Sequence, residues 1–153
     1  MEIKRKVISG LLALTYFVIG YFIPFIAFGQ YQCRIQDSLY ALIPLFGFSG
    51  VVGTFLGHLI YNIYGFSIGI ALGWPDLLSP FLFLIPKILL WKFGLKALPI
   101  HFLFVALWVG VLLQIQFGVS LLIGSINVGI GEAIALGIGV PLNYTFRRII
   151  NKE

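Results

Sequence analysis

Residues 121–140, LLIGSINVGIGEAIALGIGV, form a run of twenty residues that carries a single charge, Glu132. About 20 apolar residues in a helix cross the hydrocarbon core of a bilayer, so this run predicts a membrane span that continues to about residue 148. An ionisable side chain inside such a span is costly unless it faces a polar cavity or a partner. The run therefore predicts a membrane fold and gives the first candidate for a functional residue.

The rest of the chain has the same apolar character. Of its 153 residues, 60% are hydrophobic and 10% are charged, and the mean hydropathy is +1.06. This composition leaves too little polar surface for a soluble fold. Turn signals divide the chain into six apolar segments, at 6–28, 36–47, 49–66, 77–95, 99–117 and 121–148. We expect an all-α integral membrane bundle of six spans, with residues 1–153 as one transmembrane domain and the first segment as a span rather than a cleavable signal peptide.

The basic residues indicate the orientation of the bundle. Nine of the ten fall into three clusters at the ends of apolar segments: Lys4 to Lys6; Lys87, Lys92 and Lys96; and Arg147, Arg148 and Lys152. Lys and Arg accumulate on the cytoplasmic side, which predicts a multi-pass protein of the cell membrane with both termini in the cytoplasm. No cluster combines a sustained basic face with exposed aromatic residues, so nucleic-acid binding is not expected.

Three further charges fall in segments that this orientation places outside. Arg34 is the basic residue that departs from the positive-inside pattern, and Asp37 and Asp76 lie on the same predicted side. One interpretation is structural: Arg34 pairs with Asp37 and caps the second helix, and Asp76 caps the fourth. The other is that these residues form a wall over a polar site and contact its ligand.

Glu132 has small residues on its predicted helix face. Gly129 and Ala135 lie about one turn away and Ser125 a further turn, which leaves room beside the carboxylate. We interpret Glu132 as a carboxylate facing a ligand cavity. The structural alternative is that the small residues allow close helix packing and Glu132 bonds a neighbouring helix.

The third segment carries a polar stripe of Thr54, His58 and Asn62, which predicts a surface facing a cavity. Gly50, Gly53 and Gly57 form a small-residue seam on an adjoining face, suited to helix packing. A lone histidine in a span is most often a hydrogen-bonded core residue; this applies to His58 and still more to His101. Two histidines so far apart do not suggest a metal site, and a single cysteine, Cys33, excludes an intramolecular disulfide.

Motifs for catalysis and ATP hydrolysis are missing from the sequence. There is no Walker-type phosphate loop, no HExxH and no GxSxG. We therefore expect no enzyme activity, no catalytic residue, no metal and no cofactor, and energy for transport would come from an ion gradient or from partner proteins.

Four stretches resemble, in sequence and order, the queuosine-precursor (QueT-type) substrate-binding S-components of energy-coupling factor transporters. They are FGQYQCRIQDSLYALIPLFGFSGVVGTFLGHLIYNIYG, GWPDLLSPFLFLIPK, LPIHFLFVALWVG and NVGIGEAIALGIGVPL. The Arg34 and Asp37 pair ahead of LIPLFG is the most specific part. Asp37 stands where the family usually has glutamate, and Val105 and Gly124 replace expected asparagines.

This resemblance implies a six-helix S-component that captures a solute from outside and docks on a membrane coupling subunit driven by two cytoplasmic ATPases. The family's coupling face uses small residues on the first helix, here Ser9, Gly10 and Ala13. Internal packing of that helix is the alternative for these residues.

The implied substrate is a 7-deazaguanine, such as the aminomethyl or cyano precursor or queuine. A guanine-like edge offers adjacent N–H donors to a carboxylate, and Glu132 is the first choice for that acceptor. Asp37 or Asp76 would neutralise a ligand ammonium, and Asn62 would bind the carbonyl edge.

Three alternatives stay open at this stage. The first is an S-component for another vitamin-like solute, such as thiamine or biotin. The second is a proton-coupled small-molecule transporter in which Glu132 and His58 titrate. The third is a small membrane enzyme with the same two residues as an acid-base pair, which the lack of a catalytic cluster disfavours.

Overall fold

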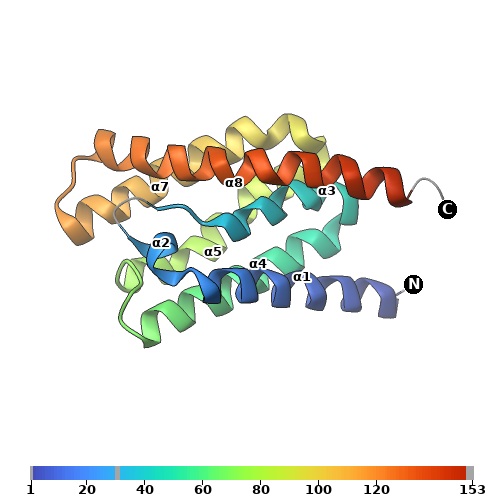
Figure 1. The fold of residues 1–153 in the computed structure, drawn as a ribbon, viewed down its shortest axis with the longest axis horizontal. Coiled ribbons are helices and arrows are strands. Elements are labelled where there is room, and N and C mark those ends of the chain that lie inside the picture. The colour runs from blue at the N-terminus through green and yellow to red at the C-terminus, as the bar shows by residue number, and fades with distance from the viewer. Residues whose placement is uncertain (1, 30–31, 151–153) are drawn as a thin grey trace.

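The computed structural model describes residues 2–29 and 32–150, and within these residues the chain is helical, with no β-strand. The predicted all-α class is confirmed for this part of the chain. The first described helix begins, and the last one ends, at the same end of the bundle (Figure 1). With η for 3-10 helices, the elements are α1 (Glu2–Phe22), α2 (Pro24–Phe28), η1 (Ile35–Leu42), α3 (Ile43–Phe46), α4 (Phe48–Ser67), η2 (Trp74–Leu78), α5 (Ser79–Leu82), α6 (Leu84–Phe93), η3 (Gly94–Ala97), α7 (Leu98–Phe117) and α8 (Leu121–Ile150).

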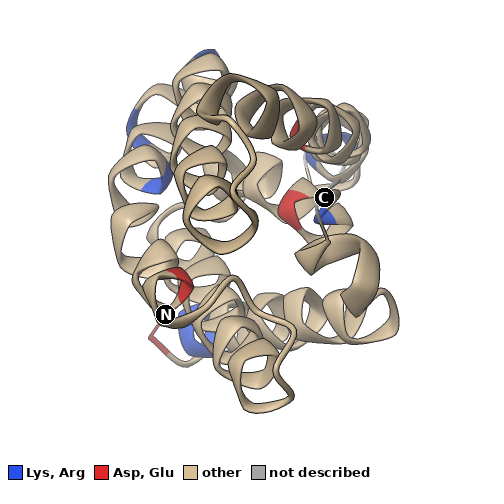
Figure 2. Cartoon of the chain, turned by 90° about the vertical axis from the view of Figure 1, so that its left-hand side faces the viewer, with Lys and Arg blue, Asp and Glu red and all other residues tan. Residues whose placement is uncertain are grey.

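Among the described residues, three helical segments are long and apolar enough to cross a membrane: Glu2–Phe22, Trp74–Phe117 and Leu121–Ile150. The second contains two of the predicted spans, and between them the chain passes through Gly94, whose φ is +67°. Glycine adopts this left-handed conformation without the strain that a Cβ would add. Charged positions are few when the bundle is seen end-on (Figure 2). The count of six spans and the cytoplasmic side of the termini stay predictions.

The second predicted segment, 36–47, is not the expected α-helical span. It consists of the 3-10 helix η1 followed by the single turn of α3, with Pro44 in its first turn. A 3-10 helix rises about 2.0 Å per residue, so η1 and α3 together reach roughly 22 Å, less than the roughly 30 Å of a hydrocarbon core. The 3-10 geometry gives this short stretch more length than an α-helix would.

Helices α1 and α4 pack closely along the predicted glycine seam. A Cβ added at Gly57 would lie 2.6 Å from the Cβ of Tyr16, and one at Gly53 would lie 2.7 Å from the carbonyl oxygen of Ser9. Such close backbone approach is what small residues permit in a helix interface within a membrane. The prediction that the seam serves helix packing is confirmed at these two glycines.

This packing corrects the expected role of two small residues on α1. Ser9 donates a hydrogen bond from Oγ to the carbonyl of Ser49 at 3.0 Å, and Ala13 is buried against the α4 seam. Both therefore take part in internal packing, as the alternative interpretation proposed. Gly10 is exposed and has open space where a side chain would be.

Glycines of α8 accommodate the segment that precedes and begins η1. A Cβ at Gly131 would overlap the carbonyl of Gln32, and one at Gly139 would overlap the carbonyl of Ser38. The backbone of residues 32–38 therefore lies directly on α8. This contact positions the side chains of that segment beside Glu132.

Lys87 lies in the interior and is not a cytoplasmic loop residue. Its side chain is fully buried; Nζ donates to the carbonyl of Thr54 at 3.3 Å and lies 4.6 Å from the centre of the Tyr40 ring. Lys92 and Lys96 are exposed. Two residues of the middle basic cluster, Lys92 and Lys96, therefore support the predicted orientation. Lys87 does not, because it is buried and makes a cation–π contact with Tyr40.

Candidate functional site

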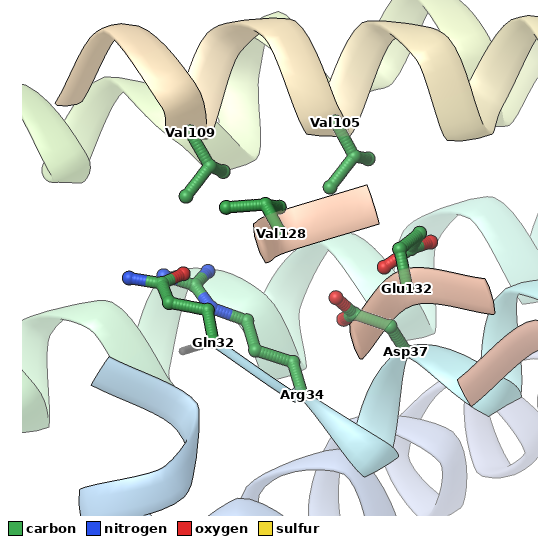
Figure 3. Close-up of a pocket in the computed structure, with 7 residues that line it drawn as sticks. All are labelled: Gln32, Arg34, Asp37, Val105, Val109, Val128 and Glu132. Atoms are coloured by element: carbon green, nitrogen blue, oxygen red, sulfur yellow. The ribbon is translucent and has the colours of Figure 1, made fainter. Parts of the chain in front are cut away.

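A small cavity lies where residues 32–37 meet α7 and α8 (Figure 3). Its volume is about 10 Å³, enough for about one water molecule. One side is polar and comes from residues 32–37 and α8. The other is apolar and is the edge of a buried cluster along α7. The lining residues are Gln32, Arg34, Asp37, Val105, Val109, Val128 and Glu132.

Asp37 and Glu132 bring two carboxylates to this cavity (Figure 3). They are 1% and 3% exposed. Oδ2 of Asp37 and Oε1 of Glu132 are buried without a hydrogen-bond partner in the described part of the chain. Buried acceptors are normally paired, because desolvation of an unpaired polar group is costly. Glu132 thus lines a cavity together with Asp37, and its contact with a ligand stays a prediction.

Gln32 is a site residue that sequence reasoning missed. Its side chain is 2% exposed, and both Nε2 and Oε1 lack partners among the described residues. The amide presents one donor group and one acceptor to the cavity. Gln32 lies in a loop, where no helical periodicity marks the residues that face inward. The one signal for Gln32 in the sequence is its position two residues before Arg34.

Arg34 lines the cavity, and its side-chain nitrogens are bonded to three other residues. Nε donates to the carbonyl of Ala27 at 3.3 Å, Nη1 is 3.0 Å from His58 Nε2, and Nη2 donates to Asp76 Oδ2 at 3.3 Å. The predicted gathering of Arg34 with Asp76 is confirmed by this ion pair. The alternative in which Arg34 pairs with Asp37 as a helix cap is wrong, since η1 has no side-chain cap.

Asp76 is held by a complete set of partners. Besides Arg34, its carboxylate accepts from Ser79 Oγ at 2.8 Å and from Asn62 Nδ2 at 3.1 Å. Neither η2 nor α5 has a side-chain cap, so the N-cap interpretation of Asp76 is wrong. Asp76 and Asn62 form a buried network beside the cavity and do not line it.

The polar stripe on α4 also serves this internal network. Thr54 donates back to the carbonyl of Gly50 at 2.8 Å, and His58 is bonded at both ring nitrogens, to Arg34 and to Tyr40. None of Thr54, His58 and Asn62 lines the cavity, so the prediction that the stripe faces it is wrong. The interpretation of His58 as a hydrogen-bonded core residue is confirmed.

His101 lies closer to the site than its sequence position suggested. It is fully buried, and its Nε2 is 3.6 Å from Glu132 Oε1, too far for a hydrogen bond. Both ring nitrogens are without partners in residues 2–29 and 32–150, and the ring packs edge-on against Tyr40 at 4.7 Å. His101 therefore lies next to Glu132.

The small residues near Glu132 have a different place from the one predicted. Ser125 and Gly129 line an apolar groove between α7 and α8 on the outside of the bundle, and Gly124 packs against the backbone of Gly110. Val128 shares the cavity with Glu132, since it lies one helical turn before it. Of the two positions where an asparagine was expected, only Val105 faces the cavity.

The electrostatic character of the cavity follows from these contacts. Its one cationic lining residue, Arg34, is already paired with Asp76, so the carboxylates of Asp37 and Glu132 have no cation bonded to them among the described residues. Burial, together with the charges of these two carboxylates, raises the pKa of the neighbouring Cys33 thiol. The cavity is thus an acceptor-rich site suited to a ligand that brings hydrogen-bond donors or positive charge.

The described residues offer no candidate metal centre, because no three His, Cys, Asp or Glu side chains gather within them. A family model described as QueT transporter matches residues 6–148. No curated protein and no solved structure matches the chain.

Proposed function

The chain belongs to the QueT transporter family, and on that premise we propose that it is the substrate-capture subunit, or S-component, of an energy-coupling factor importer. Its long apolar helices fit a membrane protein. In this proposal it binds a queuosine precursor of the 7-deazaguanine class outside the cell membrane. A membrane coupling subunit and two cytoplasmic ATPases complete the importer, and both termini lie in the cytoplasm.

The observation that carries the proposal is the pair of carboxylates with unpartnered oxygens in one cavity. A 7-deazaguanine presents adjacent N–H donors on its guanine edge, which a carboxylate accepts in bidentate fashion. We assign that role to Glu132. Asp37 would accept from a further donor or neutralise a ligand ammonium, and Gln32, with donor and acceptor both free, would bind the carbonyl edge that sequence reasoning gave to Asn62.

The residues behind the cavity have a supporting role in this proposal. A network of hydrogen bonds joins Arg34, His58, Asn62 and Asp76. In this proposal the network stabilises the polar side of the cavity, which Gln32 and Asp37 line. The ligand must enlarge the site, because small-molecule pockets measure roughly 300 Å³ or more and this cavity measures about 10 Å³. We expect the backbone of residues 32–34 to move away from α8 when the ligand enters.

A binding panel on detergent-purified protein tests the substrate class. The panel contains 7-aminomethyl- and 7-cyano-7-deazaguanine, queuine, guanine, thiamine and biotin, measured by calorimetry. We expect saturable binding of at least one 7-deazaguanine and none of thiamine or biotin. Binding of either vitamin would instead identify an S-component of different specificity, and absence of binding to every 7-deazaguanine would overturn the proposed substrate.

An uptake assay tests the mode of transport. Cells that express this chain with coupling and ATPase subunits should accumulate a labelled 7-deazaguanine, and an ATPase variant unable to hydrolyse ATP should stop uptake. Uptake by this chain alone that an uncoupler abolishes would contradict the proposal and support proton coupling. His58 is a poor carrier for that alternative, since both of its ring nitrogens are already bonded.

We place the coupling face of α1 around Gly10, because Ser9 and Ala13 pack inward. Gly10 has nothing within 4 Å of an added Cβ, so a large side chain there leaves the fold intact and blocks close approach of a partner. Gly10→Trp should abolish co-purification with the coupling subunit and leave ligand binding unchanged. Normal co-purification would move the face away from Gly10.

A further inference from the structure

A chain of hydrogen bonds connects Arg34 to the cavity carboxylate of Asp37 through three side chains that do not line the cavity. It starts where Arg34 Nη1 lies 3.0 Å from His58 Nε2. A guanidinium group has donors and no acceptor, so His58 Nε2 must be the acceptor. The proton of the neutral imidazole is therefore on Nδ1.

The direction of every later bond follows from that first one. His58 Nδ1 donates to the hydroxyl of Tyr40 at 3.2 Å. Tyr40 then donates a hydrogen bond to the hydroxyl of Tyr16 at 3.0 Å, and Tyr16 donates one to Asp37 Oδ1 at 2.5 Å. Only one arrangement of protons satisfies the chain, and it ends on the carboxylate.

The chain leaves Asp37 with its two oxygens in different states. Oδ1 is occupied by Tyr16, and Oδ2 is buried without a partner among the described residues. Asp37, Tyr16, Tyr40 and His58 are all 1% exposed or less, so water competes little for these bonds. A carboxylate fixed at one oxygen by a short hydrogen bond cannot rotate freely.

We propose that Tyr16 and Tyr40 are positioning residues of the ligand site, which hold Asp37 so that Oδ2 is the oxygen offered to the ligand. The proposal deepens the proposed function and rests on it. It also makes α1 part of the ligand site, since Tyr16 belongs to α1 and is seated on Gly57 of α4. Affinity for the ligand then depends on the packing of α1 against α4, although α1 contributes no residue to the cavity lining.

Tyr61 gives a matched control for Tyr16. Both are fully buried tyrosines in the same apolar cluster, and the Tyr61 hydroxyl donates to the carbonyl of Gly20 at 3.1 Å. Each Tyr→Phe change removes one buried hydroxyl: Tyr61→Phe loses the bond to Gly20, and Tyr16→Phe loses the bonds to Asp37 and Tyr40. Only the Tyr16 hydroxyl is bonded to Asp37.

Ligand affinity is the first readout. Tyr16→Phe should weaken binding of 7-aminomethyl-7-deazaguanine about tenfold, as expected for the loss of one hydrogen bond to a charged group. Tyr61→Phe should bind as the unchanged protein does. Equal affinity of Tyr16→Phe and the unchanged protein, where the latter binds, would overturn the positioning role and leave the proposed function standing.

Infrared difference spectroscopy on the ligand-free protein gives a second, independent readout. The spectrum of Tyr16→Phe minus that of the unchanged protein should contain a carboxyl band, because a hydrogen bond to Asp37 is lost. The band should vanish when both samples carry Asp37→Asn, and Tyr61→Phe should not produce it. Absence of the band would overturn the positioning role of Tyr16, whether or not the protein binds a 7-deazaguanine. Absence of binding, by contrast, would overturn only the proposed function.

Discussion

Asp76 and Glu132 are both carboxylates buried in the same bundle, and their surroundings differ in one respect. Asp76 accepts hydrogen bonds from Arg34, Asn62 and Ser79. Glu132 lies beside a cavity, with Oε1 unpartnered among the described residues and His101 3.6 Å away. Removing one partner of a buried ion pair leaves the other charge unpaired and destabilises the fold. A buried carboxylate without partners costs stability, which indicates a role in function.

This difference separates structural from functional acids within one membrane domain. From sequence, both were candidates for ligand contact, because both are acidic residues in an apolar chain. The bonding around each side chain decides between the roles. Substitutions at Asp76 should therefore change folding first, and substitutions at Glu132 should change binding first.

The largest effect is expected at the structural acid. Asp76→Asn leaves the buried guanidinium of Arg34 without its ion pair and should lower the free energy of unfolding by about 3–5 kcal/mol. Thermal unfolding in detergent measures the loss. Adding Arg34→Met removes the stranded charge and should restore part of the stability. A stability unchanged by Asp76→Asn would remove the contrast between the two acids.

A smaller effect is expected where the cavity wall meets α8. Gly131→Ala would place a methyl group on the carbonyl of Gln32 and should cost about 1–3 kcal/mol of stability, as overpacking does. Because Gln32 is displaced, ligand binding should weaken as well. Gly137→Ala is the matched control on the same helix: it has nothing within 4 Å and should stabilise α8 by roughly 0.5–1 kcal/mol. Binding that survives Gly131→Ala unchanged would argue against a ligand contact by Gln32.

The smallest effect is expected in the reactivity of Cys33, the chain's single cysteine. Its raised pKa comes first from burial and then from the charges of Asp37 and Glu132. Glu132→Gln removes one negative charge, which lowers the thiol pKa and increases the thiolate fraction at a given pH. Alkylation by iodoacetamide near neutral pH should therefore become a few times faster. An unchanged alkylation rate would mean that the charge of Glu132 does not affect the pKa of Cys33.

The helical class was predictable because hydropathy and turn signals are local properties of the sequence. The closeness of Arg34 and Asp76 was anticipated from their predicted side of the membrane, but their pairing was not, because it joins residues 42 positions apart. The inward position of Lys87 was missed because a lysine beside a turn normally marks the cytoplasmic side. The part played by Gln32 and His101 depends on how residues 32–38 lie on α8, which no periodicity reveals.

Glu132→Gln, assayed for stability and for binding on the same preparation, tests the central claim most directly. The substitution keeps the shape of the side chain and removes the unpaired charge. We expect thermal stability equal to or above that of the unchanged protein, with affinity for the best 7-deazaguanine reduced about 100-fold. A loss of stability like that of Asp76→Asn, or an affinity that is unchanged, would contradict the assignment of Glu132 as the residue that binds the ligand.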